Sequence, residues 1–377
     1  MTQSHQQRLD IAKKNKSDEF YTQLSDIEKE LPFYKDQFQN QIIFCNCDDP
    51  YESYFFKYFA TNFNFLGLKK LIATCYDGSP FAFKQITLFD ICNLRPKPSD
   101  HKRPYKIEIN EVEAPNLDGA VDLADVERLI KNKKNVLTLL KGNGDFRSPE
   151  CVELLKSSNI IVTNPPFSLF REYVSQLFNY NKNFLIIGNI NSVTYKEIFP
   201  LIMNNKLWMG QSIHSGDREF RVPDNYPLEA AGCRVDEEGR RYIRVKGVRW
   251  FTNLDVPRRH EKLTLPKRYT PTDYPRYDNY DAIEVSSVAN IPYDYEGMMC
   301  VPITFLDKYN PDQFDILGIT DRQNSSGLRT KKYTLHDSDK YNDLNARGVI
   351  LTPNGYKAKY ARVIIKHKGI PNKDTAP

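Results

Sequence analysis

Residues Asn164-Pro165-Pro166-Phe167 combine groups that together could activate an amine. Proline has no N–H, so the side-chain oxygen of Asn164 and the carbonyl of Pro165 can present two acceptors without a competing backbone donor. A ring NH2 is a poor nucleophile because the ring shares its lone pair, and two accepted hydrogen bonds push electron density back onto the nitrogen. Phe167 adds a face for stacking a flat ring. The tetrapeptide predicts methyl transfer to such an amine, although Asn-Pro-Pro also occurs as a stiff turn.

A methyl donor needs a second site beside this loop. A sulfonium such as S-adenosylmethionine leaves as a neutral thioether, so the protein's task is alignment, which can supply about 7–11 kcal/mol. The turn from Asn46 to Pro50 follows an apolar strand and is a suitable place, although it lacks the glycines of a G-x-G-x-x-G loop. Asp48 or Asp49 could bind the donor's amino group or could cap the next helix.

Asp145 and Phe146 lie a few residues before the strand that leads into the Asn-Pro-Pro-Phe loop. A carboxylate at this place could accept a hydrogen bond from an adenine amine, and the aromatic ring could flank a bound ring. Asp145 could also be a plain turn residue. We therefore treat Asn46, Asp48, Asp49, Asp145 and Phe146 as candidate donor-binding residues.

Alternating strands and helices must position these loops. The apolar run from Asn159 to Thr163 predicts a buried strand before the Asn-Pro-Pro-Phe loop, and Ser168 to Phe178 has helical spacing after it. The other predicted strands are 41–44, 70–75 and 183–190, and the other predicted helices are 26–38, 51–65, 149–156 and 194–204. This alternation is typical of an α/β fold, which binds ligands at the carboxyl ends of its strands.

Basic and aromatic residues are interleaved after about residue 207, in short segments typical of β structure. Cationic side chains hold phosphates, while planar groups and arginine forks reach bases. The pattern favours a nucleic-acid surface, with a solvated face of a β-rich domain as the alternative. The candidate DNA-binding residues are Arg218, Arg221, Arg249, Trp250, Arg258 and Arg259.

The chain is long enough for a large domain and a smaller attached one. We expect a catalytic domain over 1–206, which contains an irregular insertion at 77–141 with a helix candidate at 123–131. A smaller, β-rich target-recognition region is expected over 207–310, followed by a C-terminal extension over 311–377.

The composition is that of a globular protein: of 377 residues, 40% are hydrophobic and 27% are charged, with a net charge of +5. No apolar stretch reaches the length of a bilayer, and Met1 to Ser17 has no apolar core of a signal peptide, so we expect a soluble, cytoplasmic protein. The seven cysteines lack the C-x-x-C spacing of zinc sites. They predict free thiols and no metal.

Several longer strings resemble the EcoRI-type adenine-specific DNA methyltransferases. They are KSDEFYTQ at 16–23, FCNCDDP at 44–50, FFKYFATNF at 55–63, LGLKKLIATCY at 66–76, GDFRS at 144–148, VTNPPFSLFREY at 162–173, SVTYKEIF at 192–199 and YPRYDNYDAIEV at 274–285. The resemblance extends from about residue 13 to residue 316. Strings of this length and order are far more specific than NPPF alone, which methyltransferases acting on RNA or protein share.

The resemblance implies a monomer with a Rossmann-like, S-adenosylmethionine-dependent methyltransferase fold. It also implies N6 methylation of adenine in double-stranded DNA, together with a separate restriction endonuclease; the family example recognises GAATTC. The target base must swing out of the duplex to reach the loop. By resemblance, the catalytic residues are Asn164, Pro165, Pro166 and Phe167, and the cofactor wall contains Asp18, Phe20, Tyr21 and Thr22.

Two other functions are compatible with parts of the sequence. An RNA N-methyltransferase could use the same acceptor loop, and competition between duplex DNA and structured RNA would distinguish it. A catalytically silent DNA-binding scaffold is supported by the glycine-poor turn after Phe44. Calorimetric binding of the donor would separate that scaffold from an enzyme.

Overall fold

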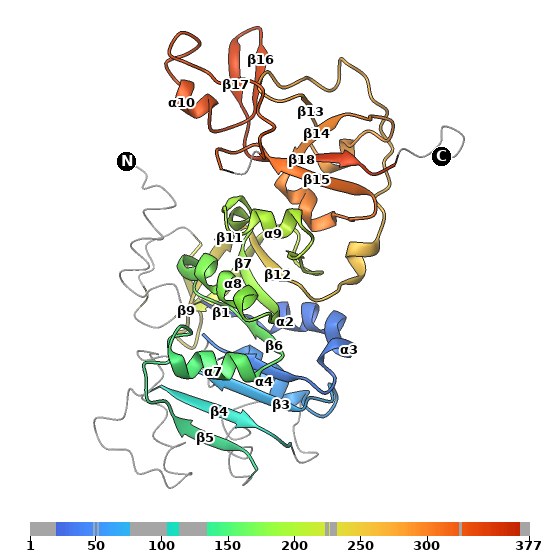
Figure 1. Cartoon of the computed structure of the whole chain (residues 1–377). Coiled ribbons are helices and arrows are strands. Elements are labelled where there is room, and N and C mark those ends of the chain that lie inside the picture. Colours follow the sequence, from blue (N-terminus) through green and yellow to red (C-terminus); the bar gives the residue numbers. More distant parts are fainter. Residues whose placement is uncertain are drawn as a thin grey trace. The chain divides into compact units, whose positions relative to one another are not determined.

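The structure is a computed structural model that describes residues 20–47, 50, 53–75, 104–112, 134–222, 226, 232–323 and 326–369 (Figure 1). Its internal contacts divide the chain into two compact units. Unit 1 comprises residues 1–189 and 215–254, and unit 2 comprises residues 190–214 and 255–377. The units are therefore interleaved along the chain, unlike the successive regions 1–206, 207–310 and 311–377 expected from the sequence.

Parallel strands form the centre of the main sheet of unit 1. They are β2 (Ile42–Cys45), β3 (Lys70–Thr74), β6 (Ile160–Thr163) and β7 (Asn183–Asn189), in the order β3-β2-β6-β7. Every residue of β6 is buried, as expected for a strand covered on both faces. These strands start and end within one or two residues of the predicted ranges, which confirms the α/β alternation.

Helices pack on both faces of this sheet. The usual right-handed crossover predicts that the helix after β2 and the helix after β6 lie on opposite faces, and Figure 1 shows α7 (Pro149–Ser157) and α8 (Phe170–Asn179) together on one face. The helical elements of unit 1 are α2 (Leu24–Glu30), η1 (Leu31–Tyr34), α3 (Lys35–Phe38), α4 (Tyr54–Thr61), α7 (Pro149–Ser157), η4 (Phe167–Leu169) and α8 (Phe170–Asn179). The helix expected over 26–38 is divided into α2, η1 and α3 because Pro32 removes a backbone donor.

Residues 77–141 do not leave the sheet as the sequence suggested, and this prediction is wrong for their described part. β4 (Tyr105–Ile109) pairs antiparallel with β3, and β5 (Val136–Leu139) pairs antiparallel with β4. The alternating burial of β4 marks a half-covered strand, whose five-residue pattern is too short to be distinctive. The helix predicted at 123–131 lies outside the described residues.

A second, antiparallel sheet of unit 1 joins the N-terminal motif to the segment 215–254. Its strands are β1 (Tyr21–Thr22), β9 (Asp217–Val222), β11 (Arg241–Lys246) and β10 (Arg234–Val235), in the order β1-β9-β11-β10. The next strand, β12 (Val248–Thr252), pairs antiparallel with β7 of the main sheet. Much of the segment that the sequence assigned to target recognition is therefore built into the unit that contains the Asn-Pro-Pro-Phe loop.

Unit 2 is β-rich and contains a four-stranded sheet in the order β13-β14-β18-β15. The strands of this sheet are β13 (Ala282–Glu284), β14 (Met298–Pro302), β15 (Phe314–Ile319) and β18 (Arg362–His367). A separate hairpin is formed by β16 (Val349–Thr352) and β17 (Gly355–Ala358). Its other elements are η5 (Ile190–Thr194), α9 (Phe199–Met203), β8 (Trp208–Met209), η6 (Pro257–His260), η7 (Val288–Asn290), η8 (Ile303–Lys308) and α10 (Tyr341–Leu344). The expected boundary at residue 310 thus falls inside one sheet.

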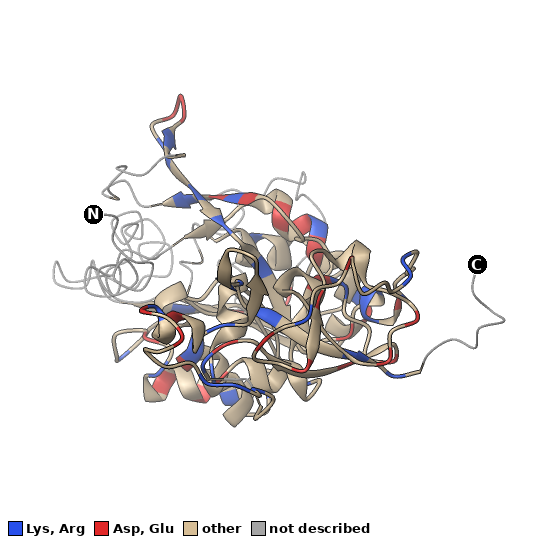
Figure 2. Cartoon of the chain, turned by 90° about the horizontal axis from the view of Figure 1, so that it is seen from above, with Lys and Arg blue, Asp and Glu red and all other residues tan. Residues whose placement is uncertain are grey.

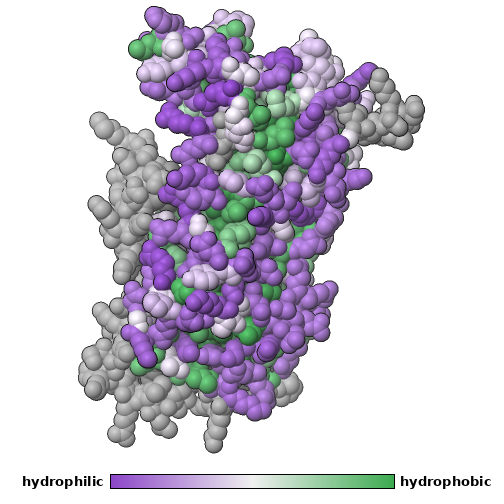
Figure 3. Space-filling model, viewed as in Figure 1, coloured by the Kyte–Doolittle hydropathy of each residue, from purple (hydrophilic) through white to green (hydrophobic). Residues whose placement is uncertain are grey.

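Charged side chains of both signs are interspersed along the described ribbon, in keeping with the small net charge (Figure 2). The face shown in Figure 3 is mostly hydrophilic, with hydrophobic residues visible in limited patches between polar ones. No helix within the described ranges is long and apolar enough to cross a bilayer. The six cysteines that the structure describes are free thiols.

Candidate active site

The Asn-Pro-Pro-Phe loop begins where β6 ends, beside the turn that follows β2. β2 and β6 are adjacent parallel strands, and the chain runs outward from them in opposite directions, to β3 and to β7. This reversal is the topological switch point at which open α/β sheets bind ligands. The Thr163 hydroxyl donates to the Asn46 carbonyl, so the two loops are joined directly.

The turn after β2 is supported by α8. The buried Tyr173 hydroxyl donates to Asn46 Oδ1, and burial raises the pKa of Tyr173 well above its ordinary value, so this hydroxyl remains a neutral donor. The following residue, Cys47, has a φ of 72°, in the left-handed region that glycine usually occupies. Cys47 thus adopts the left-handed backbone conformation that a glycine usually provides in such a turn. The candidate residues Asp48 and Asp49 lie outside the described residues.

The Asn164 side chain is buried, with 5% of its surface exposed. Its Nδ2 donates to the backbone carbonyl of Phe20, which fixes the orientation of the amide. Its Oδ1 is buried and receives no hydrogen bond within the described structure. Because an unsatisfied buried acceptor costs about 1–3 kcal/mol, this oxygen is suited to a donor brought by a ligand.

The prolines shape the start of the next helix. The Pro166 carbonyl accepts a hydrogen bond from the Leu169 N–H at 2.9 Å, which opens η4. Pro165 is buried, whereas Phe167 is half-buried and keeps part of its ring accessible. The structure therefore brings the four predicted catalytic residues together in one loop at the sheet edge.

An aromatic cluster is built around Phe20, whose carbonyl holds Asn164, and also contains Phe167, Phe220 and Tyr226. The Phe20 ring centroid lies 5.5 Å from that of Phe167, 5.8 Å from that of Phe220 and 6.2 Å from that of Tyr226. Phe220 is on β9 and pairs with Thr22 of β1, so the predicted cofactor-wall strand holds it in place. Sequence reasoning missed Phe220 and Tyr226, although Phe220 is the apolar position between Glu219 and Arg221 on β9.

Phe20, whose carbonyl contacts Asn164, and the following β1 residues Tyr21 and Thr22 are therefore at the site. Tyr21 is 4% exposed and Thr22 is 3% exposed, so they contribute mainly backbone and packing to the wall. Asp18, the fourth residue of this motif, lies outside the described residues.

Phe146 and Asp145 approach the same network from the loop before α7. The Phe146 ring packs 5.0 Å from that of Tyr173, and the Phe146 carbonyl accepts from Gln176 Nε2 at 3.1 Å. The Asp145 carboxylate accepts two hydrogen bonds from the Arg147 guanidinium, at 2.8 and 2.7 Å. Sequence reasoning missed Arg147, which holds this carboxylate and also pairs with Glu172 at 2.9 Å.

The six predicted DNA-binding residues are not gathered on one surface. Arg249 and Trp250 lie on β12 with 3% and 1% of their surfaces exposed, and the Trp250 ring packs 5.9 Å from that of Phe55. A side chain enclosed in the core cannot contact DNA, so the structure contradicts both assignments. All five residues of β12 are buried, and the adjacent aromatic residues Trp250 and Phe251 were the sequence signal for a strand covered on both faces.

The remaining arginines divide between the units. In unit 1, Arg218 Nε lies 3.4 Å from the Asp26 carboxylate, and the half-buried Arg221 pairs with Tyr21 across β1 and β9. In unit 2, Arg258 donates to the Gln211 carbonyl at 3.1 Å. Arg259 stacks 3.9 Å from the Trp208 ring, and burial lowers its pKa.

An α/β sheet with an Asn-Pro-Pro-Phe loop at its switch point is typical of one class of protein, the methyltransferases that act on amines or amides. Within that class, the chain belongs to the family described as "Adenine-specific methyltransferase EcoRI", whose model matches residues 8–368. This confirms the resemblance found in the sequence.

Curated relatives support the same family. The chain is 46% identical over 311 residues to the Type II methyltransferase M.EcoRI of Escherichia coli, covering 82% of this chain and 88% of the relative. It is 36% identical over 366 residues to the Type II methyltransferase M.MgeORF184P of Mycoplasma genitalium, covering 95% and 98%. It is 33% identical over 362 residues to the Type II methyltransferase M.MpnI of Mycoplasma pneumoniae, covering 95% and 97%. No solved structure matches the chain.

Proposed function

We propose that this protein methylates N6 of an adenine in double-stranded DNA, with S-adenosylmethionine as the donor. The observation that carries the proposal is the buried, oriented and unsatisfied Oδ1 of Asn164. An adenine amine is a donor that fits this acceptor. The membership of an adenine-specific methyltransferase family supports the choice of base.

Asn164 and Pro165 act on the amine through their acceptors. Oδ1 of Asn164 and the carbonyl of Pro165 accept hydrogen bonds from the two N6 hydrogens, which leaves the nitrogen lone pair free to attack the methyl group. As the new N–C bond forms, N6 releases one proton to water. The accessible part of Phe167 stacks against the adenine ring. Because N6 lies within the duplex stack, the target base must swing out, at a cost of a few kcal/mol.

S-adenosylmethionine, when bound, supplies a methyl group on a sulfonium that leaves as a neutral thioether. The turn of Asn46 and Cys47 fits this group because its left-handed backbone gives the close approach usually provided by glycine, at the switch point of a Rossmann-like sheet. Phe146 packs on Tyr173, which holds that turn, and the Phe20 carbonyl holds Asn164 beside it. The roles of Asp18, Asp48, Asp49 and Asp145 in donor binding remain predictions.

We infer that unit 1 carries catalysis and that unit 2 contributes to DNA binding. The printed names of the relatives, Type II methyltransferases, support a role as the modification arm of a restriction-modification system with a separate endonuclease. We expect the enzyme to act as a monomer in the cytoplasm. Its recognition sequence is found by sequencing DNA that it has methylated.

Purified protein, S-adenosylmethionine and unmethylated genomic DNA provide the direct test. Digestion to nucleosides and mass spectrometry should show N6-methyladenine with the native enzyme and with the surface variant Asn204→Ala. At matched, early times, Asn164→Ala should form about 10²- to 10³-fold less. Methylation of structured RNA in preference to DNA by a folded, donor-binding protein would overturn the proposed substrate.

The base-flipping step has its own test. A duplex with 2-aminopurine at the target position should become more fluorescent on binding, because an extruded base is no longer quenched by stacking. A probe that stays dark on binding, with methylation of the natural duplex intact, would contradict extrusion into the Asn164 loop.

A further inference from the structure

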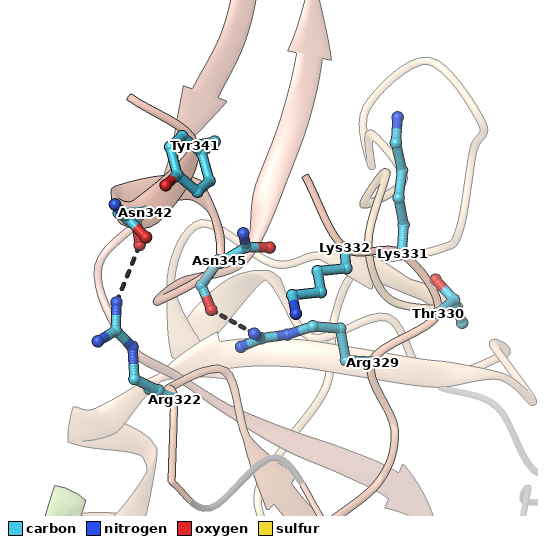
Figure 4. A pocket seen from close by; sticks show the side chains of 8 residues that line it. All are labelled: Arg322, Arg329, Thr330, Lys331, Lys332, Tyr341, Asn342 and Asn345. Atoms are coloured by element: carbon cyan, nitrogen blue, oxygen red, sulfur yellow. Dashed lines mark hydrogen bonds between the residues drawn. The ribbon is translucent and has the colours of Figure 1, made fainter. Parts of the chain in front are cut away.

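A basic pocket lies in unit 2, and none of its lining residues has been assigned a role above. Its volume is about 560 Å³, and its lining includes Arg322, Arg329, Lys331, Lys332, Asn342 and Asn345 (Figure 4). These residues come from the segment between β15 and β16, which includes α10. The lining includes four cationic side chains and no carboxylate, so this basic pocket is suited to an anion.

Three of the four cations lack a carboxylate partner among the described residues. Arg322 donates to the Asn342 carbonyl at 3.1 Å. Arg329 donates to the Asn345 carbonyl, to the Tyr280 hydroxyl at 3.2 Å and to the Asp321 carbonyl at 3.0 Å. These acceptors are neutral, so they orient the guanidinium groups without cancelling their charge.

Lys331 and Lys332 differ in whether a carboxylate neutralises them. Lys331 forms an ion pair with Asp278 at 2.8 Å, and this hydrogen bond raises the pKa of Lys331. Lys332 is exposed and forms no ion pair within the described part of the chain. The basic pocket thus carries an uncompensated charge from Arg322, Arg329 and Lys332.

The donors favour a phosphate over a simple halide. Guanidinium groups present planar forks that match phosphate oxygens, and lysine adds a point charge. Nε of Arg329 is buried and makes no hydrogen bond within the described structure, so the basic pocket also contains an unused donor. The cavity is much larger than one phosphate group, which leaves room for the sugars attached to a phosphodiester.

We propose that the basic pocket binds a backbone phosphate of the DNA outside the recognition sequence, through Arg322, Arg329 and Lys332. This inference rests on the proposed function. A polyanion is favoured over free phosphate because Arg322 and Lys332 are exposed, and binding at exposed charges draws much of its free energy from release of the counterions condensed on DNA. The contact is sequence-independent and adds affinity without selecting bases.

The double variant Arg322→Gln/Lys332→Gln tests the proposal in the full chain. It leaves Arg329 in place, because Arg329 also joins Tyr280 and Asp321 and its loss could disturb folding. The matched control is Lys308→Gln/Lys357→Gln, which removes two exposed lysines of unit 2 that do not line the basic pocket. Circular dichroism confirms that both variants are folded.

Fluorescence anisotropy measures the affinity for one duplex with the target site and one without it, between 50 and 200 mM salt. The pocket variant should lose affinity about tenfold for both duplexes, and the slope of log K against log salt should fall by about 2. The kcat at saturating DNA should be unchanged, and the control variant should behave as the native protein.

Three results would overturn the proposal: affinity and slope equal to those of the control variant, loss confined to the target duplex, or loss of inorganic phosphate binding with DNA affinity unchanged. Loss confined to the target duplex would indicate base readout. Loss of phosphate binding alone would indicate a site for free anions; phosphate binding is measured by 31P NMR titration at constant ionic strength. Failure of the proposed function is seen separately, as DNA binding without N6-methyladenine.

Discussion

The Asn-Pro-Pro-Phe loop of unit 1 lacks a hydrogen-bond donor for one buried oxygen, whereas the basic pocket of unit 2 lacks a negative charge for its cations. Around Asn164 the chain satisfies the amide nitrogen and leaves one buried oxygen without a donor. Around Arg322 and Arg329 the chain supplies neutral acceptors and leaves positive charge without a counterion. The first arrangement favours a ligand that donates a hydrogen bond, whereas the second favours an anion such as a phosphate.

This difference indicates how selectivity and affinity are divided. A single buried acceptor discriminates strongly, because a ligand without a matching donor leaves it unsatisfied. Exposed cations discriminate little but act over several ångströms and respond to salt. Variants in unit 1 should therefore alter turnover or stability, and variants in the basic pocket should alter DNA affinity.

The largest expected effect concerns Trp250, which has the residue type of a DNA contact but the environment of a core residue. Trp250→Ala should lower the free energy of unfolding by about 3–5 kcal/mol, because it removes a buried ring that packs on Phe55. Urea unfolding measures the loss. Trp250→Phe keeps an apolar ring and removes an indole N–H that has no partner, so it should cost far less. Native stability with weakened DNA binding in Trp250→Ala would restore the residue to the DNA surface.

Substitutions at Asn164 should affect turnover rather than affinity. Asn164→Ala removes the acceptor and should reduce kcat about 10²- to 10³-fold, as for the loss of one preorganised polar contact in other enzymes. Asn164→Asp keeps an acceptor but cannot donate to the Phe20 carbonyl, so its kcat should fall less. Single-turnover kinetics and DNA binding distinguish the two steps. An equal loss of DNA affinity in both variants would assign Asn164 to structure instead.

A smaller effect is expected at Tyr173, which supports the turn after β2. Tyr173→Phe leaves Asn46 Oδ1 without its donor and should cost about 1 kcal/mol of unfolding free energy. Affinity for S-adenosylmethionine should fall about fivefold, with kcat at saturating donor unchanged, because only the position of the turn is disturbed. Calorimetric titration with the donor measures this, with the exposed Tyr360→Phe as control. If Tyr173→Phe binds S-adenosylmethionine with native affinity, the turn after β2 does not bind the donor.

Local patterns in the sequence were sufficient to predict the central strands and to locate the Asn-Pro-Pro-Phe loop. β6 and β7 are continuous apolar runs, and the Asn-Pro-Pro-Phe loop is contiguous, so its geometry follows from adjacent residues. The contacts of Asn164 with Phe20 and of Phe220 with Phe167 join residues more than fifty positions apart. No periodicity reveals such contacts.

The same limit explains the errors in the basic region. Arg249 and Trp250 have suitable residue types, but their burial depends on the pairing of β12 with β7, which brings together residues about sixty positions apart. The basic pocket was not predicted, although Lys331 and Lys332 belong to a lysine-rich segment, because what distinguishes its cations is the absence of nearby carboxylates in space. Residue type predicts what a side chain can do, whereas pairing decides whether it is accessible.

The smallest expected effect is at Asp278, the carboxylate that neutralises Lys331 beside the basic pocket. Burial opposes ionisation of Asp278, but hydrogen bonds from Lys331 and Tyr333 outweigh it and lower its pKa. Asp278→Asn should leave Lys331 unpaired and raise DNA affinity about twofold, with a slightly steeper salt dependence. An unchanged affinity would show that Lys331 does not face the bound phosphate.

The pH dependence of Asp278→Asn provides an independent measurement. A carboxyl whose pKa is lowered by folding stabilises the protein above its unfolded pKa of about 3.9, and this stabilisation is lost as the pH falls through the lower folded pKa. The native protein should therefore be more stable than the variant at neutral pH, and the difference should vanish in strong acid. Urea unfolding at several pH values measures it. A difference that persists below the folded pKa would mean that packing, rather than the ion pair with Lys331, accounts for the effect of the substitution.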